Sequence, residues 1–109
     1  MPGIAFHGDD LCCDGVSLTE IAAVCGTPTY VYSAAAILER LEALRAALSP
    51  VPHLVCYAVK TNSNLAILDL LSRAGSGFDI VSRGELHRLL RAGARPERIV
   101  FAGVGKRED

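Results

Sequence analysis

The sequence lacks any apolar run approaching the length of about 18 residues that a membrane-spanning helix needs. No basic segment followed by an apolar one opens the chain, so no secretory leader is predicted. An excess of charge is missing too, because the formal net charge is −1 at pH 7. This balance gives no electrostatic basis for binding nucleic acid or an anionic membrane. These absences predict a soluble protein of the cell interior.

The chain also lacks the cysteine and histidine spacing of a disulfide framework or a metal site. It contains four cysteines, but no CxxC pair, and its three histidines are scattered. Cys12 and Cys13 are adjacent, Cys25 falls in a helical segment and Cys56 in an apolar strand. Reduced thiols are typical of cytoplasmic proteins, and we expect that location here.

What the chain does have is the composition of one small globular domain. Half of its 109 residues are hydrophobic and 21% are charged, which is ordinary for a folded protein. Basic residues gather in the second half, where Arg88, Arg91 and Arg95 recur at helical spacing. A solvated outer helix face explains this spacing best.

The first third of the chain gives few strong signals. Residues 1–16 are expected to be irregular, with a weak strand signal at 11–13. Ser17 to Glu20 forms a capping box, so a short helix is predicted from there to about Val24, ended by Gly26. After Thr27 and Pro28, the residues 29–32 are typical of a strand.

The remainder alternates between apolar strands and capped helices. Ser33 is predicted to cap a helix that ends before Pro50, Asn62 or Ser63 to cap a second, and Ser82 to cap a third. The second and third helices are expected to end at Gly75 and Gly93. Strands are predicted at 53–60, 78–81 and 99–102.

This order predicts a parallel α/β sheet with right-handed crossovers. The strands are apolar throughout, as expected where both faces of a sheet are covered. A doubly wound sheet and a (β/α)8 barrel both fit. A barrel takes about 250 residues, and nothing follows the last strand to cover it. We therefore expect a fragment, or the first part of a barrel.

Two glycine-containing motifs do not fit nucleotide-binding loops. The segment 103–106 lacks the earlier glycine of a phosphate loop, and Arg107 stands where Ser or Thr is required. The segment 75–77 precedes a strand instead of opening a helix, which excludes the dinucleotide fingerprint.

Polar residues at the predicted strand ends are the candidates for chemistry. Lys60, Asp79, Ser82 and Lys106 follow or lie in parallel strands, whose carboxyl ends converge on one edge. A carboxylate within an apolar strand must be paired or exposed, and Lys60 is the expected partner of Asp79. Two interpretations stay open: a structural Lys–Asp pair, or a reactive lysine that forms a Schiff base with an aldehyde such as pyridoxal phosphate.

Three motifs resemble one enzyme family. Tyr57–Asn62, Gly75–Leu86 and Ile99–Lys106 are similar, in order and spacing, to the pyridoxal-phosphate-dependent decarboxylases with an alanine-racemase-type barrel. The resemblance implies the first βα units of a (β/α)8 TIM-type barrel, truncated, over residues 33–109. Residues 1–32 would belong to the β-rich second domain.

The resemblance also implies functions for single residues. Lys60 would carry pyridoxal 5'-phosphate as a covalent Schiff base, and Asp79 and Ser82 would help to bind this cofactor. Residues 14–18 and 26–32 most resemble the members that convert meso-2,6-diaminopimelate to L-lysine and CO2. A cytoplasmic homodimer is implied for the complete protein, with an amino acid as substrate and neither nucleic acid nor membrane as partner.

Several family features fall outside the resemblance. The phosphate loop, the acidic partner of the pyridine nitrogen and the substrate-binding residues lie downstream of the region matched, so the 109 residues alone are expected to be inactive. Two alternatives remain: a decarboxylase of the same family for another basic amino acid, such as ornithine or arginine, and a non-catalytic pyridoxal-phosphate-binding protein.

Overall fold

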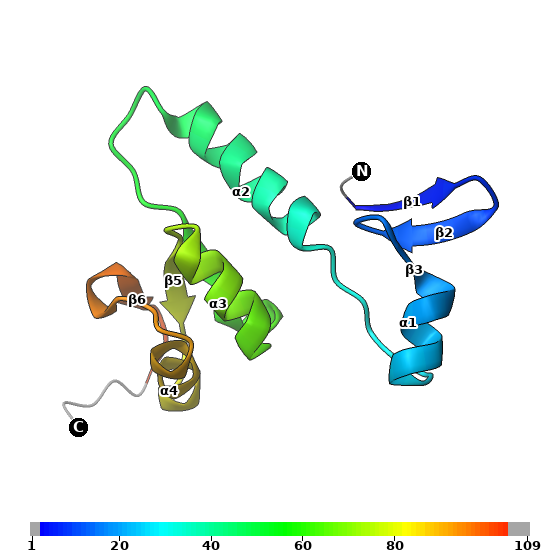
Figure 1. Ribbon diagram of the computed structural model, residues 1–109. Helices are drawn as coiled ribbons and strands as arrows, with labels where there is room; N and C mark the ends of the chain where they lie inside the picture. The colour runs from blue at the N-terminus through cyan, green and yellow to red at the C-terminus, as the bar shows by residue number, and fades with distance from the viewer. Residues whose placement is uncertain (1–2, 105–109) are drawn as a thin grey trace. The chain divides into compact units, whose positions relative to one another are not determined.

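The computed structural model describes residues 3–104 and divides the chain into two compact units, Met1–Arg40 and Leu41–Asp109. Each unit is considered by itself. Helix α2 (Ala34–Leu48) contains the division. Figure 1 shows the order of the elements along the chain.

The first unit opens with a three-stranded antiparallel sheet. Its strands are β1 (Ile4–His7), β2 (Asp10–Cys13) and β3 (Val16–Ser17), in that order. The expected strand at 11–13 is confirmed, but the expectation of an otherwise irregular start was wrong. Asp14 and Gly15 both have positive φ angles, 51° and 84°, which gives the tight turn that joins β2 to β3.

Helix α1 (Leu18–Cys25) follows the sheet and begins as predicted. The Ser17 hydroxyl accepts a hydrogen bond from the Glu20 N–H at 3.4 Å. The strand predicted at 29–32 is absent from the described residues, because this extended segment has no neighbouring strand with which to pair. Tyr30 is accordingly 89% exposed.

The start of α2 is held by two side chains. The Ser33 hydroxyl accepts a hydrogen bond from the Ala36 N–H at 2.9 Å, which confirms the predicted cap. Asp14 then accepts hydrogen bonds from the Ser33 hydroxyl at 2.6 Å and from the Ala35 N–H at 3.2 Å. Asp14 thereby ties the β2–β3 turn to the helix.

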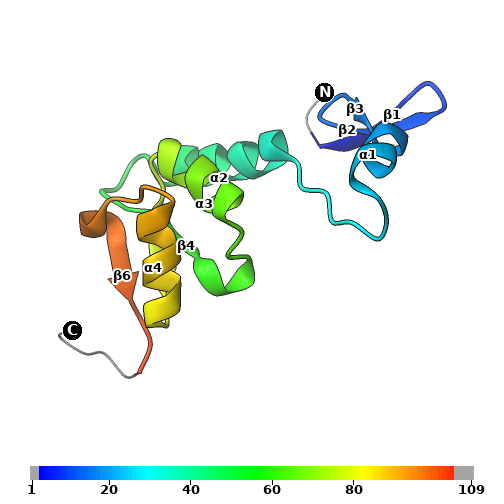
Figure 2. The ribbon, with the colours of Figure 1, turned by 60° about the horizontal axis from the view of Figure 1, so that its bottom comes forward.

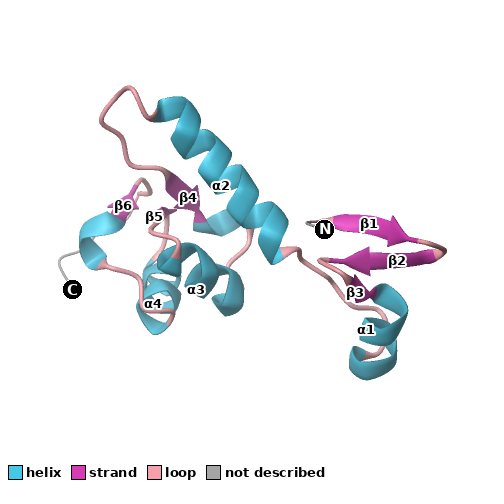
Figure 3. Cartoon of the chain, turned by 45° about the horizontal axis from the view of Figure 1, so that its top comes forward, coloured by secondary structure: helices cyan, strands magenta, loops and turns pink. Residues whose placement is uncertain are grey.

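The second unit contains the predicted parallel sheet. Its strands are β4 (Cys56–Ala58), β5 (Gly77–Ile80) and β6 (Ile99–Phe101), in the order β4-β5-β6. Helices α3 (Leu65–Arg73) and α4 (Arg83–Arg91) form the two crossovers. Figures 2 and 3 show these two helices side by side next to the strands. The prediction of a parallel βαβαβ run is confirmed.

Some boundaries differ from the predictions. The strand expected at 53–60 is shorter, because a 3-10 turn, η1 (Val59–Thr61), follows Ala58. The cap of α3 is neither Asn62 nor Ser63 but Asn64, whose side chain accepts from the Ala66 N–H. Helix α4 begins at the predicted cap, and a second 3-10 turn, η2 (Pro96–Arg98), precedes β6.

The two faces of this sheet differ in character. Phe78 and Ile80 are each 1% exposed and belong to the core with Leu68 and Leu89 of the two helices. Asp79 lies between them on β5 and therefore points to the opposite face. Its register neighbour on β6, Val100, is 49% exposed. The helices thus cover one face, and Asp79 belongs to the other.

Gly77 begins β5 where neighbouring atoms come very close. A Cβ atom at this position would lie 2.9 Å from Sγ of Cys56 and 3.1 Å from the carbonyl oxygen of Arg98. Close strand packing therefore explains this glycine without a nucleotide. Within residues 3–104, no helix combines the length and the apolar character needed to cross a membrane.

Candidate functional site

The candidate site lies at the carboxyl edge of the parallel sheet. Lys60 follows β4, Asp79 is the third residue of β5, and Ser82 follows β5 as the cap of α4. The parallel register pairs Ala58 with Asp79. The structure therefore brings the three predicted site residues to one edge of two adjacent strands.

Lys60 occupies the middle of the η1 turn and is exposed. The predicted ion pair between Lys60 and Asp79 is wrong for the described structure, where the ion pairs are Arg45–Glu42 and Arg73–Asp69. The reason is local, because β4 ends at Ala58, two residues before Lys60, whereas Asp79 remains within β5. The amine of Lys60 is consequently free of an ionic partner among residues 3–104.

Asp79 presents an acceptor with no protein partner among the described residues. Its Oδ1 atom is buried and receives no hydrogen bond there. Cys56, on β4, belongs to the same face, because its register neighbour is Gly77 and Asp79 lies two residues further on. Burial raises the pKa of the Cys56 thiol, and the charge of Asp79 raises it further. A buried carboxylate oxygen of this kind is costly unless something binds it.

Ser82 is engaged by its own helix. Its hydroxyl accepts a hydrogen bond from the Glu85 N–H at 3.1 Å and donates one to Glu85 Oε2 at 3.0 Å. The other oxygen, Glu85 Oε1, is buried without a partner in the described part of the chain. Two buried carboxylate oxygens among the described residues thus have no partner: Asp79 Oδ1 on β5 and Glu85 Oε1 in the first turn of α4.

The residues after Lys60 are held by side chains from outside the turn. The Tyr57 hydroxyl donates to the carbonyl oxygen of Asn62, and Arg88 Nε donates to that of Ser63, both at 2.8 Å. Sequence reasoning assigned Arg88 to a solvated face and so missed this contact. Arg88 is indeed exposed, and its spacing gives no sign of the bond.

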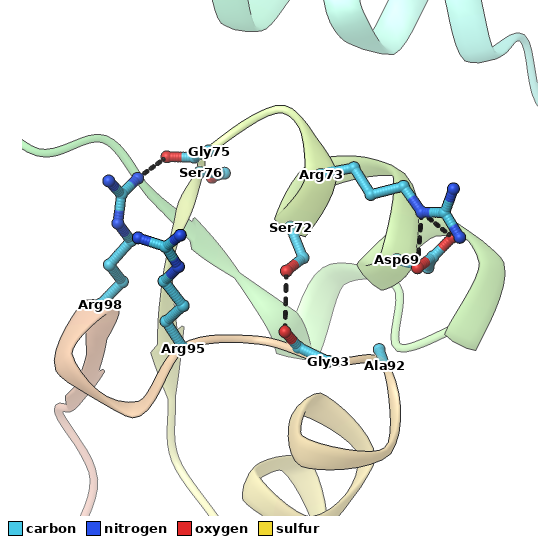
Figure 4. A pocket seen from close by; sticks show the side chains of 9 residues that line it. All are labelled: Asp69, Ser72, Arg73, Gly75, Ser76, Ala92, Gly93, Arg95 and Arg98. Carbon is cyan, nitrogen blue, oxygen red and sulfur yellow. Dashed lines mark hydrogen bonds and ion pairs between the residues drawn. The ribbon is translucent and has the colours of Figure 1, made fainter.

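A cavity of about 410 Å³ lies at the other end of the sheet. Figure 4 shows that it is bordered by the ends of α3 and α4 and by the residues before β5. Two of its three arginines are engaged locally: Arg73 pairs with Asp69, and Arg98 donates to the carbonyl oxygen of Gly75. The Arg98 bond satisfies a carbonyl group in the loop between α3 and β5. None of the predicted site residues borders this cavity. Lys106 is outside the described residues.

The family of the chain follows from comparisons with known proteins. Residues 34–109 match the family model described as "Pyridoxal-dependent decarboxylase, pyridoxal binding domain". The chain belongs to this family. The fold class is therefore that of the pyridoxal-dependent decarboxylases, and the resemblance noted in the sequence is confirmed.

Individual relatives are similar over nearly the whole chain. A diaminopimelate decarboxylase from Pseudomonas aeruginosa is 53% identical over 109 residues, which is 100% of this chain and 26% of that protein. A crystal structure of a protein from Aquifex aeolicus matches with a TM-score of 0.87 and 50% identity, over 96% of this chain and 26% of the other. Diaminopimelate decarboxylase from Helicobacter pylori, crystallised with L-lysine, matches with a TM-score of 0.70 and 41% identity. The match covers 80% of this chain and 23% of that one. The chain thus spans about a quarter of the length of these relatives.

Proposed function

We propose that this chain is the amino-terminal part of a diaminopimelate decarboxylase, which converts meso-2,6-diaminopimelate to L-lysine and CO2. The 53% identity to the Pseudomonas aeruginosa enzyme over the entire chain supports this substrate. The observation that carries the proposal is the placement of Lys60 at the carboxyl edge of the parallel sheet, next to the strand that holds Asp79. Parallel α/β folds place their active sites at this edge.

The residues at this edge fit pyridoxal 5'-phosphate. The exposed amine of Lys60 can reach an aldehyde and bind it covalently as a Schiff base. The unpartnered Asp79 Oδ1 offers a buried acceptor for the cofactor or for the Lys60 ammonium. Ser82 lines the same edge, and its bonds to Glu85 hold the start of α4 in place.

Bound pyridoxal phosphate would supply an electron sink that accepts the electron pair released when the substrate carboxylate leaves as CO2. The contribution of this chain is to bind and orient. Lys60 supplies the attachment point, and a proton must replace the lost carboxylate to complete L-lysine.

Three further features belong to the proposal. Residues 33–109 form the first part of the cofactor-binding barrel, and residues 1–32 are part of a β-rich second domain. The four thiols are free, which supports a cytoplasmic location. The complete protein is proposed to be a homodimer, as the family resemblance implies.

The test uses the full protein that its gene encodes, incubated with pyridoxal phosphate and reduced with borohydride. Peptide mass spectrometry should place the cofactor on Lys60, and Lys60→Ala should lose both the label and the release of CO2 from meso-diaminopimelate. Lys106→Ala is the matched control and should keep the label on Lys60. A label on another lysine would overturn the site. If Lys60 is labelled but CO2 is released only from ornithine or arginine, the proposed substrate is wrong. If Lys60 is labelled but none of these amino acids is decarboxylated, the protein binds the cofactor without catalysis.

A further inference from the structure

We infer that Arg88 and Tyr57 are positioning residues that fix the chain just beyond Lys60 and so set where the Lys60 amine lies. This inference rests on the proposed function of Lys60. Its structural basis is a pair of hydrogen bonds to consecutive carbonyl groups. Tyr57 Oη donates to Asn62 and Arg88 Nε donates to Ser63, each at 2.8 Å.

The turn that carries Lys60 is short and is closed by few hydrogen bonds of its own. It is a single 3-10 turn of three residues, closed by the Asn62 N–H to Val59 carbonyl bond at 3.2 Å. Bonds of this type have poorer geometry than those of an α-helix, and such turns are short. The Thr61 hydroxyl adds a bond to the Ala58 carbonyl at 2.7 Å. Val59 is fully buried, whereas Lys60 and Thr61 are exposed.

The two donors come from different elements. Tyr57 lies in β4, directly before the turn, and its ring packs edge-on against Phe78 of β5. Arg88 lies in the middle of α4, 25 residues after Ser63. Tyr57 therefore links Asn62, the residue after the turn, to β4. Arg88 links Ser63 to α4.

The Arg88 contact connects the two halves of the candidate site. Helix α4 begins at Ser82, directly after the strand that holds Asp79. The Arg88 bond thus adds a direct link from α4 to the residues after Lys60, beside the strand ladder and the contact of the Tyr57 ring with Phe78. Losing either donor should let the turn move, so that the Lys60 amine spends less time where it meets the aldehyde.

The test compares variants of Arg88 in the full protein. Arg88→Met removes the donor, whereas Arg88→Gln keeps an N–H donor the same number of bonds from the backbone as Nε. Tyr57→Phe removes the other donor. Arg91→Met is the matched control, because Arg91 is an exposed arginine of the same helix with no side-chain hydrogen bond among the described residues.

Two measurements are made on each variant. Without cofactor, amide hydrogen exchange over residues 59–64 should be about 3- to 10-fold faster in Arg88→Met and in Tyr57→Phe, the range expected for one lost hydrogen bond. With pyridoxal phosphate, the rate of covalent attachment to Lys60 should fall by a similar factor. Arg88→Gln should restore both values most of the way, and Arg91→Met should change neither.

Unchanged exchange and unchanged attachment in Arg88→Met and Tyr57→Phe would overturn the inference. So would an equal effect of Arg88→Gln and Arg88→Met, since a donor would then be irrelevant. Failure of the proposed function has a different signature, because the parent protein itself would not be labelled at Lys60. In that case the exchange measurement still decides whether Arg88 and Tyr57 hold the turn.

Discussion

Asp79 has an oxygen buried in a way that should lower the stability of the fold. It lies within an apolar strand with a buried oxygen that has no partner among residues 3–104. Leaving a buried polar group unpaired costs about 1–3 kcal/mol. A chain that only needed this strand to fold would be more stable with a neutral residue here. The cost is understandable if Asp79 serves a bound group, as the proposed function requires.

The variant Asp79→Asn should therefore affect the stability of the fold and the attachment of the cofactor differently. Because no protein group among the described residues bonds the buried oxygen of Asp79, removing the charge should not lower the free energy of unfolding by more than about 0.5 kcal/mol, measured by urea denaturation without cofactor. Attachment of pyridoxal phosphate to Lys60 should become slower in the same variant. The pKa of the Cys56 thiol should also fall, since the Asp79 charge no longer raises it, and its alkylation should become faster.

The matched control is Asp69→Asn, which breaks an exposed ion pair with Arg73. Its effect on stability should stay within about 0.5 kcal/mol, with no effect on Cys56 or on cofactor attachment. A clear loss of stability in Asp79→Asn would mean that the carboxylate has a structural partner, and the trade-off argued for Asp79 would be wrong.

At the residue scale, the sequence was most informative where a polar residue interrupted an apolar strand. Lys60 and Asp79 stood out because an apolar core does not tolerate them without a reason. Their expected ion pair was wrong because the sequence gives no sign that the strand ends at Ala58. Arg88 could not be identified at all, since an arginine on an exposed face looks the same whether or not it meets a carbonyl group 25 residues away.

At the scale of elements, Asp14 links a turn and a helix. Its carboxylate accepts hydrogen bonds from the Ser33 hydroxyl and from the N–H groups of Ala35 and Gly3. The bond from Ser33, followed by those from the backbone, lowers the pKa of Asp14 below its ordinary value. Because the folded-state pKa is depressed, the ionised carboxylate stabilises the fold above the ordinary range for Asp, near pH 4. This contribution is lost as the pH falls through the folded-state value.

We expect Asp14→Asn to lower the free energy of unfolding at pH 6 and to make the acid-induced loss of stability smaller. Denaturant unfolding at pH 6 and at successive lower pH values measures both. The control is Asp9→Asn in the exposed turn between β1 and β2, which should leave the profile unchanged. If Asp14→Asn and the parent lose stability in parallel on acidification, the linkage between Asp14 and α2 would be disproved.

Helices were predicted better than strands because their ends carry specific residues. The caps at Ser17, Ser33 and Ser82 were all confirmed. The amino-terminal hairpin was missed, although Asp14–Gly15 between apolar residues is a strong turn signal. The strand expected at 29–32 failed for a different reason, since β-propensity describes a residue's fit to a sheet and cannot supply the neighbouring strand.

At the scale of the whole molecule, the parallel sheet has more apolar surface than its two helices cover. Strands β4 and β6 each pair with one neighbour among the described residues. Around them Leu54 is 49%, Val81 39% and Val100 49% exposed. Exposed edges and apolar faces of this kind favour association with other chains. In a protein about four times as long, as the relatives are, further chain is available to cover them.

The 109 residues produced alone should therefore behave differently from the full protein that the gene encodes. The segment alone should bind a hydrophobic dye such as ANS and associate as its concentration rises, because the face with Val100 stays open to solvent. It should release no CO2 from meso-diaminopimelate, since the segment spans only 26% of the Pseudomonas aeruginosa relative. Dye fluorescence, sedimentation and CO2 release measure the three differences.

Replacing Val100→Thr on the open face should reduce association, whereas Val24→Thr, at a residue that is 86% exposed in the other unit, should have less effect. A segment that stays monomeric, excludes the dye and releases CO2 would show that the open face is no interface and that these 109 residues suffice for the reaction.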